Sequence, residues 1–171
     1  MESNYDNGRF WRLISSSSTL AVEGKMDMTA QDIINQLALT PHPEGGWYRE
    51  TWRGRHDGGD ERGHASLIYY LLERGQRSHW HKIDATEIWL HQAGGALRLH
   101  TWSGGNVTTR RLGTDITEGD VLQACVEPGE WQAADTDAAW VLVSCMVAPG
   151  FTFSGFEMAP PGWEPGHPAR R

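Results

Sequence analysis

Short runs in which apolar and polar residues alternate occupy most of the chain, and glycine or proline pairs separate them. The clearest runs span residues 66–72, 97–102, 107–112, 121–126 and 140–147, and the aromatic run 151–157 predicts a last strand. A period of two is typical of strands that bury one face, and the Ser-Gly-Gly-Asn stretch at 103–106 predicts a hairpin turn. About nine or ten short strands with regularly spaced turns indicate an all-β sandwich or barrel.

One short helix precedes these strands. Thr29 is the predicted N-cap, and Ile33, Ile34 and Leu37 have the spacing that buries one stripe of a helix. The helix is predicted to continue to Leu39, after which prolines end it. Residues 1–25 have no sustained period and predict an irregular or disordered extension, so the domain spans residues 26–158 and a proline-rich irregular tail spans 159–171.

Composition excludes several classes of protein. Among 171 residues, 39% are hydrophobic and 22% charged, as in an ordinary single soluble domain. The net charge of −7, with scattered arginines, excludes a nucleic-acid surface. No apolar run approaches the length of a membrane span and no signal-peptide pattern opens the chain, so we expect a cytoplasmic protein with no membrane partner. Cys125 and Cys145 lie in apolar runs, which predicts buried free thiols.

The candidate chemistry lies between Gly75 and Gly94. His79 and His81 are two residues apart, so a regular strand would project both imidazoles from one face. Glu87 follows a short turn, and a returning strand would bring its carboxylate toward them. Two imidazoles and a carboxylate favour a divalent-metal site or an acid–base site.

The same stretch resembles the first motif of the cupin superfamily, with Gly75, His79, His81, Glu87 and Gly94 in its pattern. Residues 119–132 resemble the second motif, and the segments HPEGGWYRET, SLIYYLL, PGEWQAA and VAPGFTFSGFE are similar to the cupin-5 family. That family is related in fold to epimerases of the dehydrorhamnose type. The resemblance covers residues 28–158 and implies a double-stranded β-helix, or cupin jelly roll, with a pocket inside the barrel and a homodimeric assembly.

Two positions depart from the general cupin pattern. The spacing from His81 to Glu87 is one residue longer than usual, and Gln132 stands where metal cupins carry their last histidine. Glutamine is a weaker ligand than imidazole, so metal affinity is expected to fall.

Three functions follow as hypotheses, all with a small molecule in the barrel. In the first, His79, His81, Glu87 and Gln132 hold Fe, Mn, Ni or Zn, with open positions for water or substrate.

The second hypothesis is metal-free acid–base catalysis like that of the sugar-nucleotide epimerases. His81 is then the base, oriented by Glu87, and Tyr48 or Tyr70 is the acid. One or both of two tryptophans, Trp89 and Trp131, would form a stacking wall for a sugar or base.

The third hypothesis is a non-catalytic module that binds a ligand. Its polar groups would be Glu44, Arg49, Glu50 and Gln132. These groups would fix the orientation of the ligand, or else serve only as hydrogen-bonding groups at strand ends.

Overall fold

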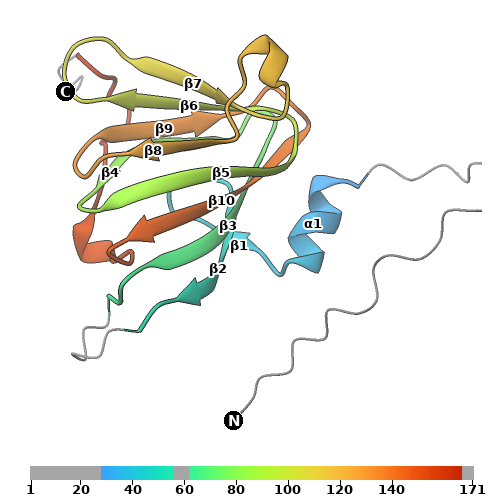
Figure 1. The fold of residues 1–171 in the computed structure, drawn as a ribbon, viewed down its shortest axis with the longest axis horizontal. Coiled ribbons are helices and arrows are strands. Elements are labelled where there is room, and N and C mark those ends of the chain that lie inside the picture. Colours follow the sequence, from blue (N-terminus) through green and yellow to red (C-terminus); the bar gives the residue numbers. More distant parts are fainter. Residues whose placement is uncertain (1–27, 56–61, 167–171) are drawn as a thin grey trace, which may run out of the picture.

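Two antiparallel sheets face each other and enclose the interior (Figure 1). The computed structural model describes residues 28–55 and 62–166; the predicted extension 1–25 lies outside them. The first sheet has the strand order β1-β2-β3-β10-β5-β8, and the second has the order β11-β4-β9-β6-β7. In chain order the described strands are β1 (Thr40–Pro41), β2 (Trp47–Arg53), β3 (Ser66–Glu73), β4 (Arg77–Ile83), β5 (Thr86–Gly94), β6 (Leu97–Trp102), β7 (Thr108–Leu112), β8 (Gln123–Val126), β9 (Trp131–Asp135), β10 (Trp140–Ala148) and β11 (Phe156–Met158).

The alternation locates the long strands accurately. β6 has the predicted limits, and β3 and β10 each extend one residue beyond theirs. The aromatic run at 151–157 is an exception, because the 3-10 turn η2 (Phe153–Gly155) interrupts it and only Phe156 onward pairs with β4. The strand predicted over residues 151–157 was therefore wrong for residues 151–155.

The helix α1 (Ala30–Gln36) begins as predicted, with a capping box between Thr29 and Asp32. It ends three residues before the predicted Leu39, because Leu37 is its C-cap and Ala38 has a positive φ of 51°. Ile33 and Ile34 pack with Leu71 on the outer side of the first sheet. Among the described residues, no helix is long and apolar enough to cross a membrane.

The hydrophobic core fills one end of the barrel and leaves the other end open for a site. On β3, the inward residues Tyr70 and Leu72 are buried in the core, whereas Ser66 and Ile68 line a cavity. Leu97 and Leu99 of β6 are fully buried on the opposing sheet. Because successive inward residues of one strand change from core to cavity, the site lies at the end of the barrel where β3 begins.

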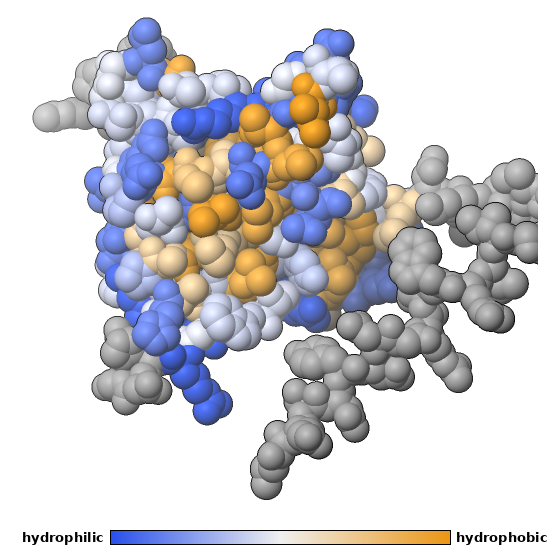
Figure 2. Space-filling view, in the orientation of Figure 1, coloured by the Kyte–Doolittle hydropathy of each residue, from blue (hydrophilic) through white to orange (hydrophobic). Residues whose placement is uncertain are grey.

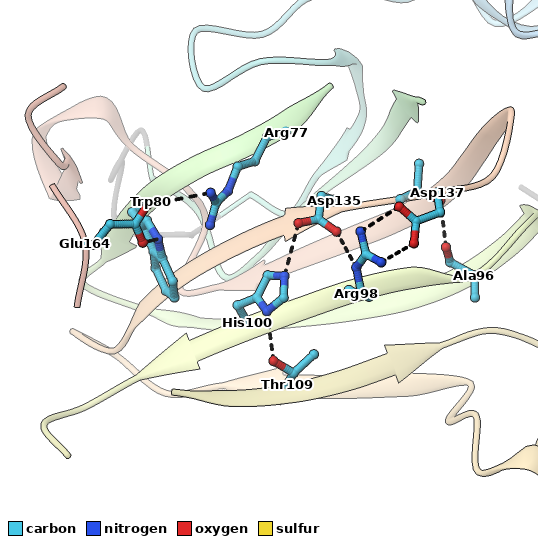
Figure 3. Close-up of polar contacts among 10 residues, drawn as sticks. Arg77, Trp80, Ala96, Arg98, His100, Thr109, Asp135, Asp137 and Glu164 are labelled. Atoms are coloured by element: carbon cyan, nitrogen blue, oxygen red, sulfur yellow. Dashed lines mark hydrogen bonds and ion pairs between the residues drawn. The ribbon is translucent and has the colours of Figure 1, made fainter. Parts of the chain in front are cut away.

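The described part of the tail, up to residue 166, contains no strand after β11, yet it packs on the outer face of the second sheet. Trp163 stacks 4.5 Å from Trp131 and 6.1 Å from Trp80 between ring centroids. The indole of Trp80 donates a hydrogen bond to Glu164, which also lies 3.9 Å from Arg77 (Figure 3). These tryptophans therefore anchor the tail to the sheet.

The two cysteines are both free thiols, as predicted. Cys145 is buried, but Cys125 is exposed. Its burial was wrongly predicted, because it faces outward from β8 between the inward Ala124 and Val126.

Candidate functional site

A cavity of about 190 Å³ lies between the two sheets at the open end of the barrel. Its polar wall consists of His42, Glu44, Tyr48, His81 and Glu87. Its apolar wall consists of Ile68, Ile83, Val147, Phe151, Phe153 and Phe156. The remaining lining residues are Glu50, Arg53, Ser66, Cys145 and Thr152. Ionisable groups thus share a confined space with aliphatic and phenyl groups.

A glycine turn places Glu44 in this wall. Gly45 and Gly46 have φ values of 107° and 70°, which side chains rarely adopt. A Cβ at Gly45 would lie 2.2 Å from the carbonyl oxygen of Arg77, so the turn packs directly against β4. The amide of His79 donates to the carbonyl of Glu44 at 2.9 Å and holds the turn there.

A β-bulge in β4 separates the two histidines that the sequence places on one face. Ser78 pairs with Ala134 of β9 and His81 pairs with Gln132, so β4 has one extra residue between these pairs. The extra residue breaks the two-residue period. His81 is therefore buried in the cavity wall, whereas His79 is exposed outside it.

Hydrogen bonds fix the tautomer of His81. Its Nδ1 lies 2.7 Å from the carbonyl oxygen of His79 and 3.2 Å from Oε2 of Glu44. A carbonyl oxygen only accepts hydrogen bonds, so Nδ1 must carry the hydrogen. In the neutral ring, Nε2 then carries the lone pair and is the nitrogen able to take a proton.

Glu44 is a buried carboxyl between two imidazoles. Its Oε1 lies 3.6 Å from Nδ1 of His42, which accepts a hydrogen bond from the Glu44 amide. Burial raises the pKa of Glu44 to about 8, so this carboxyl is mostly protonated at pH 7. Burial, together with the nearby His81, lowers the pKa of His42 to about 4.

A chain of hydrogen bonds orients Glu87. The indole of Trp89 donates to Oε1 of Gln132 at 2.9 Å, and an indole N–H can only donate. The amide of Gln132 must therefore present its NH₂ group to Glu87, to which it donates a hydrogen bond. The thiol of Cys145 is a further hydrogen-bond partner of the same carboxyl.

The electrostatics of Glu87 and His81 are coupled. Burial raises the pKa of Glu87 to about 7. The nearby His81 lowers this pKa in part, and the nearby Glu44 raises it further. Burial lowers the pKa of His81, and the Glu87 charge partly offsets this. Near neutral pH the cavity therefore holds a neutral imidazole next to carboxyls that can each keep or release a proton.

Arg53, the one lysine or arginine side chain in the described wall, is fully occupied at the mouth of the cavity. Its guanidinium binds both oxygens of Glu50, at 2.6 and 3.1 Å. It also donates to the carbonyl oxygens of Arg62 and Phe151, at 2.8 and 3.0 Å. These four hydrogen bonds leave Arg53 little capacity for an anionic ligand.

The structure brings together part of the predicted site. His81, Glu87, Tyr48 and Glu50 all line the cavity, as does Glu44. These are the positions at which strand alternation or the glycine turn points a side chain inward.

Several other predicted site residues lie outside the cavity wall: His79, Arg49, Tyr70, Trp89, Trp131 and Gln132. Arg49 is exposed on the outer face of β2, opposite Tyr48. Trp131 faces outward from β9, with the ammonium of Lys82 4.8 Å from its ring centroid. Trp89 belongs to the core, so neither tryptophan of the predicted stacking wall lines this cavity.

Tyr70 and Gln132 are buried behind the wall. The hydroxyl of Tyr70 donates to the carbonyl of Gly45 at 2.7 Å, so it braces the glycine turn. Of the two tyrosines considered as the acid, only Tyr48 reaches the cavity. Gln132 holds Glu87 from behind, as described above, and is not a lining residue.

The sequence interpretation missed His42 and the three phenylalanines of the wall. A signal for His42 existed, because it stands two residues before Glu44 and shares its turn. The phenylalanine signal was misleading, because Phe151 and Phe153 alternate like a strand and yet belong to a loop and the turn η2.

The predicted metal ligands do not fit a metal ion in this arrangement. Within residues 28–55 and 62–166, no three His, Cys, Asp or Glu side chains are grouped closely enough to hold one. The bulge removes His79, and Gln132 turns its oxygen toward Trp89 and away from Glu87. We therefore derive no chemical step through a metal.

Comparison with known proteins identifies the family of the chain and agrees with its fold. Residues 31–159 match the family Cupin_5, described as a cupin superfamily family (DUF985), which confirms the resemblance seen in the motifs. A protein from Shewanella oneidensis of known crystal structure is 38% identical with a TM-score of 0.74, covering 78% of this chain and 85% of that one. A hypothetical protein from Leishmania major is 32% identical with a TM-score of 0.69, covering 76% and 86%.

Two further proteins are less similar. An uncharacterized protein of Saccharomyces cerevisiae is 30% identical over 144 residues, 72% of this chain and 71% of that protein. A Klebsiella pneumoniae protein with a double-stranded β-helix domain is 17% identical with a TM-score of 0.51, covering 73% and 93%. The predicted jelly-roll fold is thus confirmed.

The raised carboxyl pKa values predict that the protein loses stability as pH rises from 6.5 to 8. The folded state keeps the protons of Glu44 and Glu87 after the unfolded chain has lost them, so the free energy of unfolding falls with pH. The lowered pKa values of His42 and His81 act in the opposite direction, but only below about pH 6.5.

We expect the Glu44 contribution to this fall to be about 1–2 kcal/mol. Urea denaturation at pH 6.5, 7.25 and 8 measures the fall, and Glu44→Gln should flatten it. Glu118→Gln, an exposed carboxyl on the 3-10 turn η1 (Ile116–Glu118), is the matched control. Equal stability at all three pH values in the wild type would contradict the assignment.

Proposed function

The chain belongs to the Cupin_5 family (DUF985) of the cupin superfamily, and on that premise we propose that it is a metal-free acid–base enzyme acting on a small molecule in its barrel cavity. The base is His81, and the acid is a protonated carboxyl of the Glu44–Glu87 pair. This is the second of the three hypotheses that the sequence left open, changed in two respects: a carboxyl replaces Tyr48 or Tyr70 as the acid, and the substrate has no nucleotide part.

The observation that carries the proposal is the hydrogen bonding of His81. Its Nδ1–H is held by the His79 carbonyl at 2.7 Å and by Glu44 at 3.2 Å, which leaves Nε2 unprotonated in a buried wall. An imidazole oriented in this way by an acceptor on its other nitrogen is the usual arrangement of a general base.

The chemistry supported best is proton removal from a carbon next to a carbonyl group. His81 Nε2 takes the proton, and the electron pair moves onto the carbonyl oxygen. A carboxyl group kept neutral by burial donates a hydrogen bond to that oxygen and stabilises the developing charge. With a pKa of about 7, Glu87 can be protonated in the resting state and can be protonated again after each turnover.

The cavity supports a small substrate more than a nucleotide sugar. Its volume of about 190 Å³ lies below the roughly 300–1,000 Å³ of common ligand pockets. A diphosphate also requires cationic partners, and Arg53 is occupied by Glu50 and two carbonyl oxygens.

The proposal predicts exchange of carbon-bound hydrogen. We expect small ketones and aldehydes of up to about eight heavy atoms, incubated with the protein in deuterium oxide, to include compounds that gain deuterium next to the carbonyl. Proton NMR measures the exchange. It should persist with a chelator and fall by about a hundredfold or more in His81→Gln, because general-base contributions have that size.

The matched control is His79→Gln, which alters the exposed histidine of the same strand. It should keep the wild-type exchange rate. Exchange that requires added metal, or that survives His81→Gln in a folded protein, would contradict the proposal.

We also infer a homodimer formed through the outer face of the first sheet. Leu67, Met146 and Ile88 lie side by side across β3, β10 and β5, facing away from the barrel interior. Tyr69, Ser144 and Leu90 form the neighbouring row. Figure 2 shows apolar side chains gathered where Figure 1 places these strands.

A flat apolar sheet face of this kind favours pairing with a second copy. We expect light scattering to give twice the mass of one chain, and Met146→Glu to give monomers, because a carboxylate would be buried in the contact. Thr108→Glu, on the exposed strand β7 of the other sheet, should leave the mass unchanged. A monomeric wild-type protein at micromolar concentration would overturn this inference.

A further inference from the structure

The polar end of the cavity carries more potential negative charge than positive charge. Glu44 and Glu87 are 6% and 7% exposed, and both line the cavity. A carboxylate accepts up to about four hydrogen bonds, and Glu87 has partners only in Gln132 and Cys145 among the described residues. Acceptor capacity therefore remains for a ligand.

No cation of the described wall is available to these carboxyls. Arg53 is paired with Glu50 at the mouth. Burial lowers the pKa values of His42 and His81 and so keeps both imidazoles neutral near pH 7. A buried carboxylate without a positive partner is costly, whereas the same group paired with a positive ligand is not. Each carboxyl therefore either stays protonated or receives a positively charged partner from the ligand.

The other end of the cavity is apolar and aromatic. The ring centroids of Phe151 and Phe153 are 5.1 Å apart, and those of Phe151 and Phe156 are 5.9 Å apart. The ring of Phe156 lies 5.5 Å from that of His81, so the phenyl cluster borders the polar end directly. Such a wall accepts a short aliphatic or aromatic body, and phenyl faces also attract cations.

We propose that the cavity takes a small organic amine as its cationic ligand, with the ammonium group between Glu44 and Glu87 and the apolar body against the phenylalanines. The inference rests on the proposed function in that it names the substrate class of the same cavity. The enzyme then acts on an amino compound, and the bound ammonium supplies the positive charge that the wall lacks.

A matched series of three ligands tests the charge requirement. 3-Methylbutylamine, 3-methylbutanol and 3-methylbutanoate share one apolar body and differ in the charge of the head group. Titration calorimetry of the wild-type protein with a chelator present should show amine binding at least about tenfold tighter than alcohol binding, and no binding of the carboxylate. Alcohol or carboxylate binding equal to that of the amine would overturn the proposal.

Substitution locates the charge partner. Glu87→Gln should weaken amine binding about tenfold or more and leave alcohol binding within about threefold, because the amide keeps the shape but not the charge. Glu118→Gln should change neither affinity. Unchanged amine affinity in a folded Glu87→Gln protein would also overturn the proposal, and if this variant does not fold, the wild-type ligand series still decides.

The outcomes separate this inference from the proposed function. Deuterium exchange on neutral carbonyl compounds with no preference for amines supports the acid–base enzyme and overturns the amine. Amine binding with no exchange in any compound supports the amine and overturns the catalytic role. Titration with Zn²⁺ and Mn²⁺ after removal of the chelator tests whether the cationic ligand is a metal ion instead of an amine. A metal that binds while amines do not would overturn the proposal.

Discussion

The hydrogen bond from Nδ1 of His81 to the carbonyl oxygen of His79 is the interaction on which the site depends. It is made inside one strand, and the bulge of β4 is what allows it, because the bulge turns the two residues to different sides. The same bond fixes which nitrogen of the imidazole can act as a base. Backbone geometry and acid–base chemistry are thus linked at a single residue.

The site is assembled from three elements that approach one another from different parts of the barrel. The glycine turn before β2 supplies Glu44, β4 supplies His81, and β5 supplies Glu87. β4 and β5 follow each other in sequence but belong to opposite sheets, so His81 and Glu87 approach from two walls of the barrel. Burial between the sheets is the largest cause of the pKa shifts in both carboxyls, because desolvation disfavours their charged forms.

The fold was readable from the sequence because alternation and glycine turns are local signals. They located β3, β6 and β10 to within one residue. The site was readable only where the local period continues undisturbed, as at Glu87. The side on which His79 lies depends on the bulge in the pairing of β4 with β9. The direction of Trp131 could not be told from that of Trp89, because both are aromatic residues in alternating strands. Such cross-strand relations are absent from a local pattern.

The proposed acid–base chemistry requires a carboxyl in the barrel that stays protonated near neutral pH beside a neutral, oriented histidine. Carbon-13 NMR of protein labelled at its glutamate carboxyl carbons tests this most directly, with Glu44→Gln used to assign the Glu44 signal. We expect this signal to titrate with a pKa of about 8. A Glu44 signal that titrates near the ordinary value of about 4.3 would contradict it.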